Sequence, residues 1–281
     1  MNYRHAFHAG NFADVVKHLA LVAILLHLGR KDAAFAVIDT HAGRGLYDLR
    51  SEAARRTGEA EKGIGRILAA ASHSSWPALL RRYIEIVKTT GEGLYPGSPL
   101  IAARLLRRQD RFVGIEKHPD DAAALTKALA PFANLRSECA DGYARLKARL
   151  PPPERRGLVL IDPPYESPDE FQQVARALSD ALARFANGIY LLWYPVKSAG
   201  EAHAFAGAVL AAGAKKVVRV TIELEADERG GAKERLAASG LIIVNPPFGF
   251  AEEMMAVLAV AAPLLSPTAR SEVRWLAGEN D

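Results

Sequence analysis

The stretch LVLIDPPYE at residues 158–166 joins an apolar run to an acid, two prolines and a tyrosine. Proline has no N–H to donate to a neighbouring strand and restricts the residue before it, so the strand that starts this stretch must end at Asp162. The chain is stiff where the Asp162 carboxylate emerges. A similar stretch, IIVNPPFGF, returns at residues 242–250. The rest of the chain has to indicate which copy is functional.

Short apolar runs that end in polar or turn residues alternate with helical stretches along the chain. The runs are FAVIDTHAG (35–43), RFVGIEKHP (111–119), NLRSECADG (134–142), GLVLIDPPY (157–165) and GIYLLWYP (188–195). Strands that alternate with helices indicate a parallel sheet. In open sheets of this class, ligands bind beyond the carboxyl ends of the strands. The acids expected at these ends are Asp39, Glu116, Asp141 and Asp162.

The two later strand-like segments, residues 215–226 and 235–247, differ because too few residues join them for a helix. They predict an antiparallel hairpin. Between the first two strands lie about seventy residues, far more than a simple crossover needs. Residues 47–95 are therefore expected to be an inserted helical subdomain, after which Ser98 as N-cap and Pro99 restart the crossover. The predicted fold is α/β: one domain over residues 1–281, with a seven-stranded, mostly parallel sheet and one antiparallel strand.

Composition and charge restrict the class of protein only loosely. The single cysteine, Cys139, allows no internal disulfide and no cysteine-based zinc site. The net charge of +4 is compatible with a polyanionic partner without requiring one. No secretory signal is visible, and the apolar run at residues 19–29 is interpreted as part of a core helix, not as a membrane span. We therefore expect a cytoplasmic monomer without a metal.

The strand ends carry signals for a ligand. In the turn THAGRGL, Gly43 and Gly45 stand where backbone approaches a ligand closely. Asp48 occupies the place of the third glycine of the dinucleotide fingerprint, which argues against a nicotinamide dehydrogenase. Glu116 suits a ribose diol or is a surface acid, and Asp141 suits the amino group of a purine or is a helix N-cap. The order of these signals before D-P-P-Y is more specific than any one of them.

That order resembles the Rossmann-like class I methyltransferases that use S-adenosylmethionine, and D-P-P-Y resembles the catalytic motif of their amino-methylating branch. Further segments resemble the bacterial 23S ribosomal RNA (adenine-N6)-methyltransferases of the large-subunit methyltransferase J family. They are YRHAFHAGNFADVVKH (3–18), DTHAGRGLY (39–47), YPGSPLIA (95–102), LVLIDPPYE (158–166), LWYPV (192–196) and VNPPF (244–248). The resemblance covers nearly the whole chain. It implies S-adenosylmethionine as cofactor and 23S ribosomal RNA as partner, before or during subunit assembly.

The resemblance also implies roles for individual residues. It matches Tyr3, His5 and Lys17 to positions that serve the RNA substrate or catalysis, and it makes Asp162 the proton acceptor. It matches six further residues to positions around the cofactor: His18, His41, Ser98, Glu116, Asp141 and Gly142. Gly43 of the glycine turn and Asp162 of D-P-P-Y are also expected to contact the cofactor.

The chemistry expected at D-P-P-Y follows from the weak nucleophilicity of the adenine amine, whose lone pair is delocalised into the ring. Hydrogen bonds from this amine to the Asp162 carboxylate and the Pro163 carbonyl would free the lone pair. Tyr165 offers a face on which the base stacks, a contact worth about 1–3 kcal/mol. Asn245, in the second copy, is uncharged and lies outside the run of acids, so we expect it to shape a turn.

The N-terminal cluster of histidines and aromatics allows other interpretations. The apolar stripe of the helix that starts near Phe12 places Lys17 on the opposite, exposed side, as a solvated lysine. A zinc site from His5, His8 and His18 is disfavoured, because the spacing matches no common metal pattern.

A base that enters such a pocket leaves its helix or loop, so a basic surface should hold the surrounding phosphates. Candidates are Arg44, Arg50, Arg55, Arg56, Lys62, Arg81 and Arg82. Two other functions stay open. A DNA adenine-N6 methyltransferase usually carries a separate target-recognition domain, for which the insertion is small. A non-catalytic RNA-binding protein with a Rossmann core is disfavoured by the presence of Asp162, Tyr165, Glu116 and Asp141.

Overall fold

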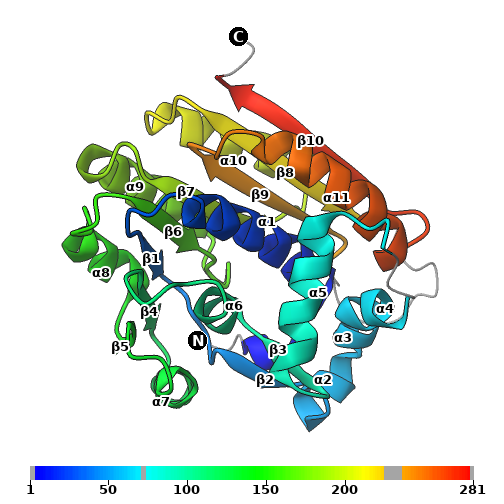
Figure 1. The fold of residues 1–281 in the computed structure, drawn as a ribbon. Coiled ribbons are helices and arrows are strands. Elements are labelled where there is room, and N and C mark those ends of the chain that lie inside the picture. Colours follow the sequence, from blue (N-terminus) through cyan, green and yellow to red (C-terminus); the bar gives the residue numbers. More distant parts are fainter. Residues whose placement is uncertain (1–3, 71–73, 225–235, 279–281) are drawn as a thin grey trace.

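The computed structural model describes residues 4–70, 74–224 and 236–278. An eight-stranded sheet lies between two layers of helices (Figure 1). Its strands, in spatial order, are β10 (Arg270–Ala277), β8 (Val217–Glu223), β9 (Ala238–Val244), β7 (Ile189–Pro195), β6 (Gly157–Ile161), β1 (Ala36–Asp39), β4 (Arg111–Glu116) and β5 (Leu135–Cys139). The α/β class and the parallel core are therefore as predicted from the sequence.

The sheet has one strand more than predicted. Strands β7, β6, β1, β4 and β5 run parallel, and β9 pairs antiparallel with both β7 and β8, which confirms the hairpin. The hairpin's turn at residues 226–234 lies outside the described residues. The prediction of seven strands with one antiparallel strand is wrong, because β10 adds a second antiparallel strand at the edge beside β8. This strand is mostly exposed or half-buried, so it lacks the apolar run by which the buried strands were recognised.

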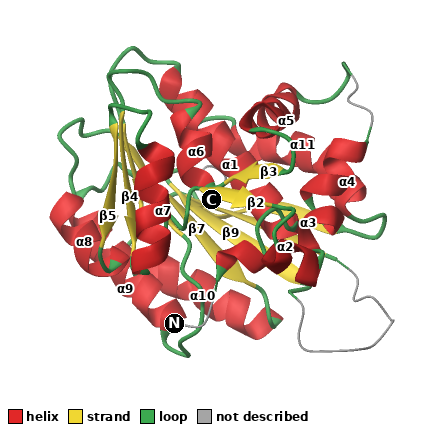
Figure 2. Ribbon diagram, turned by 90° about the horizontal axis from the view of Figure 1, so that it is seen from below, coloured by secondary structure: helices red, strands yellow, loops and turns green. Residues whose placement is uncertain are grey.

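Helices cover both faces of the sheet (Figure 2). A separate cluster of buried hydrophobic side chains packs the helices against each face. The first face carries α1 (Phe12–Gly29), α5 (Ala78–Thr90), α6 (Ser98–Ala103), α7 (Pro119–Leu129) and α11 (Phe250–Leu265). The second face carries α8 (Gly142–Arg149), α9 (Glu170–Arg184) and α10 (Ala199–Ala211). A sheet whose strands are buried on both faces explains why most strands read as continuous apolar runs.

Helix α1 is the core helix of the first layer. Asn11 caps it, since its side-chain oxygen accepts a hydrogen bond from the Asp14 amide at 2.9 Å. By length and hydropathy the helix could cross a membrane, yet 83% of it is buried within the protein. The prediction that Lys17 lies on an exposed side is wrong: only 4% of Lys17 is exposed. Neighbouring elements cover the helix nearly all round, so its apolar stripe does not mark the only buried side.

Residues 47–95 form short helices and strands beside α1. They are β2 (Leu46–Asp48), α2 (Glu52–Thr57), α3 (Glu59–Lys62), α4 (Ile64–Ala69), α5 and β3 (Leu94–Pro96), in which β2 pairs antiparallel with β3. A short 3-10 helix, η1 (His5–Phe7), precedes α1. Buried side chains of α4 and α5 join the same hydrophobic cluster as α1. The segment thus shares its core with the main layer, and its status as an inserted subdomain stays a prediction.

Helix α11 offers a matched test of this packing. Met254 is fully buried and Met255 is 47% exposed. We expect Met254→Ala to lower the free energy of unfolding by about 2–5 kcal/mol, because it leaves a cavity in the core. We expect Met255→Ala to change it by no more than about 0.5 kcal/mol. Urea denaturation of both variants checks the pair, and equal losses would contradict this account of the helix.

Candidate active site

A cavity of about 420 Å³ opens beyond the carboxyl ends of the central strands. It collects most of the side chains singled out in the sequence. Those that line it are His5, Lys17, His18, His41, Gly43, Ser98, Glu116, Asp141, Gly142, Asp162 and Pro163. Tyr165 is not part of the lining, and Tyr3 lies outside the described residues. Side chains from the N-terminus and from strand ends far along the chain therefore meet at one place.

The D-P-P-Y turn follows β6, and contacts of its Tyr165 side chain hold it in place. Tyr165 has a backbone φ of +51°, in the left-handed region that costs a non-glycine residue energy. Its hydroxyl donates to the Trp193 carbonyl at 2.8 Å, and its ring lies 4.7 Å from that of Phe171, between centroids. Tyr165 thus anchors the turn that presents Asp162 and Pro163, and its role as a stacking face stays a prediction.

An ion pair joins this turn to α1. The Lys17 ammonium lies 2.5 Å from Asp162 Oδ2 and 2.8 Å from Asp14 Oδ1. Burial alone lowers the pKa of the Lys17 ammonium, but the two carboxylates outweigh it and raise that pKa well above its ordinary value. The lysine therefore stays charged at neutral pH, where it holds the Asp162 carboxylate at the cavity.

Two histidines of the cavity are held neutral. Burial lowers the pKa of His41 to about 4, against the nearby charges of Asp162 and Asp141. Burial likewise lowers the pKa of His18 to about 3. His18 Nδ1 lies 2.7 Å from the Tyr95 hydroxyl, so its ring is fixed by a buried partner. Both imidazoles act at neutral pH as uncharged hydrogen-bonding groups.

The glycine turn and Glu116 meet directly. The Gly43 amide donates to Glu116 Oε2 at 2.9 Å, and the His118 amide donates to Oε1 at 2.8 Å. Gly43 has φ of +60°, and a Cβ there would lie 2.3 Å from the Tyr47 hydroxyl. A side chain here would be strained and would meet the Tyr47 hydroxyl, which favours glycine, and close approach of this turn to a ligand stays a prediction.

Asp141 is the N-cap of α8, one of the two roles that the sequence left open, and its contact with the amino group of a purine stays a prediction. Its side chain caps α8 by accepting from the Ala144 amide at 3.1 Å, and it also lines the cavity. The other carboxylate oxygen accepts from Lys117 Nζ at 3.0 Å. The next residue, Gly142, lies so close to β1 that a Cβ there would come within 2.0 Å of the Thr40 carbonyl oxygen. The backbone of α8 is thereby fixed against the end of β1.

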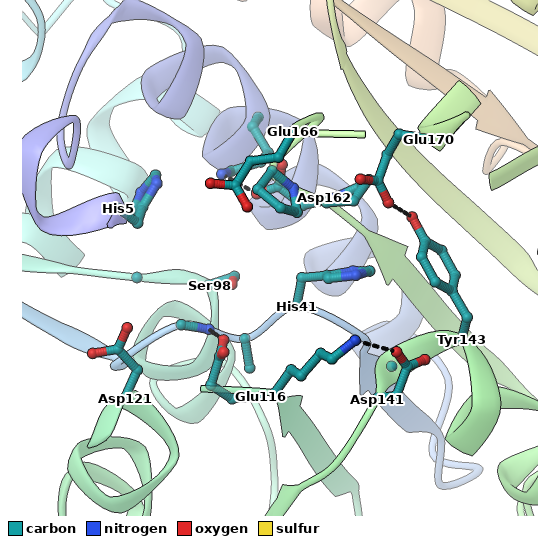
Figure 3. Close-up of a pocket in the computed structure, with 18 of the residues that line it drawn as sticks. His5, His41, Ser98, Glu116, Asp121, Asp141, Tyr143, Asp162, Glu166 and Glu170 are labelled. Carbon is teal, nitrogen blue, oxygen red and sulfur yellow. Dashed lines mark hydrogen bonds and ion pairs between the residues drawn. The ribbon is translucent and has the colours of Figure 1, made fainter. Parts of the chain in front are cut away.

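Acidic side chains surround the cavity. Figure 3 shows Asp162, Glu166 and Glu170 on one side and Glu116, Asp121 and Asp141 on the other. The sequence reasoning missed a part of this wall: Lys117, Asp121, Tyr143, Glu166 and Glu170. Glu166 directly follows D-P-P-Y, which is a signal that could have found it. Tyr143 and Glu170 are joined by a hydrogen bond of 2.7 Å between α8 and α9, which no local pattern reveals.

The N-terminal histidines have separate partners. His5 Nε2 lies 3.0 Å from Asp14, His8 Nδ1 lies 3.0 Å from Glu59, and His18 contacts Tyr95. Within residues 4–70, 74–224 and 236–278, no three His, Cys, Asp or Glu side chains are grouped to hold a metal ion.

The second proline pair shapes a turn, as expected. Asn245 has φ of +52°, and its side-chain amide donates to the carbonyls of Ala186 at 2.9 Å and Gly188 at 2.8 Å. It does not line the cavity.

Asp39 lies beneath the cavity and is fully buried. Its Oδ2 accepts from the Ser98 hydroxyl at 2.6 Å, and its Oδ1 accepts from the His41 amide at 3.2 Å. Ser98 therefore bonds to Asp39 and does not cap α6, whose N-cap is Gly97. Burial raises the pKa of the Asp39 carboxyl to about 7, although the Ser98 bond opposes this shift.

The raised pKa of Asp39 predicts a pH dependence of stability. From about pH 4 to about pH 7 the unfolded chain has released the proton that the folded chain still holds, so wild-type stability falls as pH rises through this window. Asp39→Asn removes this loss. The stability of the variant relative to wild type should therefore grow, by at most about 4 kcal/mol, up to about pH 7 and then level off. Denaturation curves at several pH values measure this difference, and a constant difference would contradict the prediction.

Comparison with known proteins identifies the family. The family model described as "Ribosomal RNA large subunit methyltransferase D, RlmJ" matches residues 32–277. The protein named ribosomal RNA large subunit methyltransferase J is 38% identical in Haemophilus influenzae and 42% identical in Escherichia coli, and each match covers 99% of this chain and 100% of the relative.

Solved structures agree with this match. A Legionella pneumophila protein of 34% identity superimposes with a TM-score of 0.86 over 97% of this chain and 99% of its own. A probable spermidine synthase from Corynebacterium glutamicum, 12% identical with a TM-score of 0.52 over 96% of this chain and 77% of its own, shares the fold alone. On the match over residues 32–277 and the full-length relatives, the chain belongs to the RlmJ family of ribosomal RNA large subunit methyltransferases.

Proposed function

We propose that this chain transfers the methyl group of S-adenosylmethionine to the N6 amine of one adenine in 23S ribosomal RNA. The observation that carries the proposal is the Asp162 carboxylate, which the rigid D-P-P-Y turn and the Lys17 ammonium hold at the cavity. Membership of the family supports a large-subunit ribosomal RNA as the substrate. That the chain acts as a monomer in the cytoplasm stays a prediction, as does action before or during subunit assembly.

The residues that line the cavity fit the methyl donor. About 420 Å³ lies within the usual range of small-molecule sites, roughly 300–1,000 Å³. Carboxylates on both sides suit a ligand that is positively charged and rich in hydroxyl and amino donors. We assign its binding to Glu116, Asp141, Gly142, His41, His18, Gly43 and Ser98, with Asp162 beside it. When bound, S-adenosylmethionine supplies a methyl group already activated on a sulfonium.

The chain's own residues then act on the adenine amine. Lys17 donates to Asp162 Oδ2, so we assign Oδ1 to accept a hydrogen from the amine. The Pro163 carbonyl accepts the second amine hydrogen, and these two bonds localise the nitrogen lone pair. Most of the acceleration comes from this positioning and from charges fixed in advance. Asp162 takes the proton that the methylated amine releases.

We assign the RNA phosphates to exposed cations of α2 and α3, which stand beside the acids Glu52, Glu59 and Glu61 of the same helices. Arg55 and Arg56 are exposed in the last turn of α2, and the guanidinium of Arg56 lies 5.7 Å from the centre of the Phe7 ring in η1. Lys62 at the end of α3 is also exposed. His5 of the same η1 lines the cavity, and on this ground we assign these cations to the phosphates beside a flipped base. Arg44 and Arg50 are exposed but pair with Asp121 and Asp48.

The experiment that tests the proposal measures transfer of labelled methyl from S-adenosylmethionine to protein-free 23S RNA that lacks the modification. Duplex DNA is assayed beside it, and the product nucleoside is identified. N6-methyladenosine at one RNA position would support the proposal. Label on DNA alone would favour the DNA methyltransferase. Label on neither substrate would leave a pre-ribosomal particle, a protein substrate or a role in RNA binding to be tested next.

Asp162→Ala is expected to lower kcat by about 10²–10⁴-fold while the cofactor still binds, because the acceptor for the amine is lost. Asp169→Ala, an exposed acid at the start of α9 that does not line the cavity, is the matched control. Initial rates and cofactor titrations measure both. Near-normal kcat in Asp162→Ala would remove this residue from the mechanism.

Replacement of Arg55 and Arg56 by alanine is expected to weaken RNA binding and to flatten the dependence of log K on log salt by about 1.5, since two phosphate contacts are lost. The control is Lys31→Ala with Arg108→Ala, which removes the same charge from exposed positions before β1 and β4, at the opposite end of the sheet. Binding titrations at several salt concentrations measure the slope. An unchanged slope in the variant that lacks Arg55 and Arg56 would show that these arginines do not contact RNA phosphates.

A further inference from the structure

Asp14 does not line the cavity, but it contacts two residues that do, Lys17 and His5. It lies in the first turn of α1 and is 2% exposed. Its Oδ1 pairs with Lys17 Nζ at 2.8 Å, and its Oδ2 accepts from His5 Nε2 at 3.0 Å and from the Gly10 amide at 2.9 Å. Both carboxylate oxygens are thus engaged, one toward each cavity residue.

The local sequence fixes this carboxylate. The Asn11 cap bonds to the Asp14 amide, which sets the first turn of the helix. The spacing of three residues places Asp14 and Lys17 on the same side of α1. A carboxylate only accepts hydrogen bonds, so His5 must carry its proton on Nε2 in this pair. Asp14 therefore determines both the place of the ammonium and the tautomer of the imidazole.

The ammonium depends on Asp14 for its position. Lys17 is a flexible side chain whose charge is removed from water, and its two carboxylate partners come from α1 and from the end of β6. Removal of one partner from a buried ion pair leaves a charge that is poorly compensated. Without the Asp14 charge, Lys17 would have only Asp162 to compensate it, and its contact with Asp162 Oδ2 would no longer be fixed from both sides.

We propose that Asp14 is a positioning residue for methyl transfer: it holds Lys17 against Asp162 and His5 on the cavity wall. The inference rests on the proposed function, because it assigns Asp14 a part in that reaction. It predicts that loss of the Asp14 charge affects turnover, and not the affinity for cofactor.

Asp110 provides the matched control, since it is as buried as Asp14 but far from the cavity. It is 1% exposed, accepts from the Phe35 amide at 3.2 Å, and pairs with Arg107 at 2.9 Å. Asp110→Asn removes a buried, paired carboxylate in the same way as Asp14→Asn. A purely structural effect should appear in both variants.

The experiment compares wild type, Asp14→Asn and Asp110→Asn for kcat, for the affinity for S-adenosylmethionine by titration calorimetry, and for thermal stability. We expect Asp14→Asn to lower kcat by about 10–100-fold with an unchanged affinity for cofactor, as small displacements of a catalytic group do. Asp110→Asn should lower thermal stability and leave kcat of the folded protein unchanged. A wild-type kcat in Asp14→Asn, or equal losses of kcat in both variants, would overturn the proposal.

The pH profile gives a second readout. The titratable groups that face Lys17 are Asp14, Asp162, His18, Asp39, Tyr47 and Tyr83, and His5 faces it through Asp14. The Asp14 charge raises the pKa of Lys17, so its removal should move the alkaline limb of the kcat profile to lower pH. Asp110→Asn should leave the limb in place, and an unmoved limb in Asp14→Asn would count against the proposal.

Two further measurements distinguish a failure of this inference from a failure of the proposed function. A crystal structure of Asp14→Asn should show Lys17 Nζ displaced from Asp162, a result that does not depend on whether the RNA is methylated. Absence of transfer by wild type would defeat the proposed function, whereas an unmoved Lys17 would defeat only this inference. If Asp14→Asn does not fold, Asp14→Glu is assayed: a lowered kcat at unchanged cofactor affinity supports the proposal, and a wild-type kcat overturns it.

Discussion

The buried ammonium of Lys17 between Asp14 and Asp162 is the interaction on which the cavity depends. It ties the first helix of the chain to the D-P-P-Y turn across a sequence separation of 145 residues. The D-P-P-Y turn fixes the backbone of Asp162, and its Tyr165, which is itself in the left-handed region, is held by a hydrogen bond from its hydroxyl to the Trp193 carbonyl. The lysine adds the orientation of the carboxylate itself. Backbone rigidity and a directed charge are thus supplied by two different parts of the molecule.

The acidic side chains of the cavity suit the expected cofactor. Carboxylates concentrate around the cavity, and His41 and His18 are kept neutral by burial, so the interior favours a cation. An interior of this kind repels phosphate groups. Arg55, Arg56 and Lys62 of α2 and α3 do not line it, and they are the cations proposed to hold a nucleic-acid backbone while only an uncharged base enters.

Much of the fold and of the site followed from the sequence, because strands of a parallel sheet direct their ends to one edge. The apolar runs located the central strands, and Asp39, Glu116 and Asp162 fell at their ends. The exposed strand β10 was not predicted, because its sequence has no apolar run. The burial of Lys17 escaped because its compensating partner Asp162 is distant in sequence, and periodicity describes only the helix itself. Helical periodicity did not single out Asp14 either, because its role depends on its contacts with both His5 and Lys17, which only the structure shows.

The separation between Lys17 and Asp162 also has a consequence for synthesis of the chain. The N-terminal helix leaves the ribosome long before the strand that supplies its second carboxylate. Until that strand docks, the lysine has only the neighbouring Asp14 to compensate its charge, and the sheet that covers the apolar sides of α1 is incomplete. During synthesis the apolar helix α1 is therefore exposed to aggregation until the strand that carries Asp162 has docked. An active site that needs both Lys17 and Asp162 cannot form before both residues have been synthesised, so we expect activity only after β6 has joined the sheet on which α1 packs.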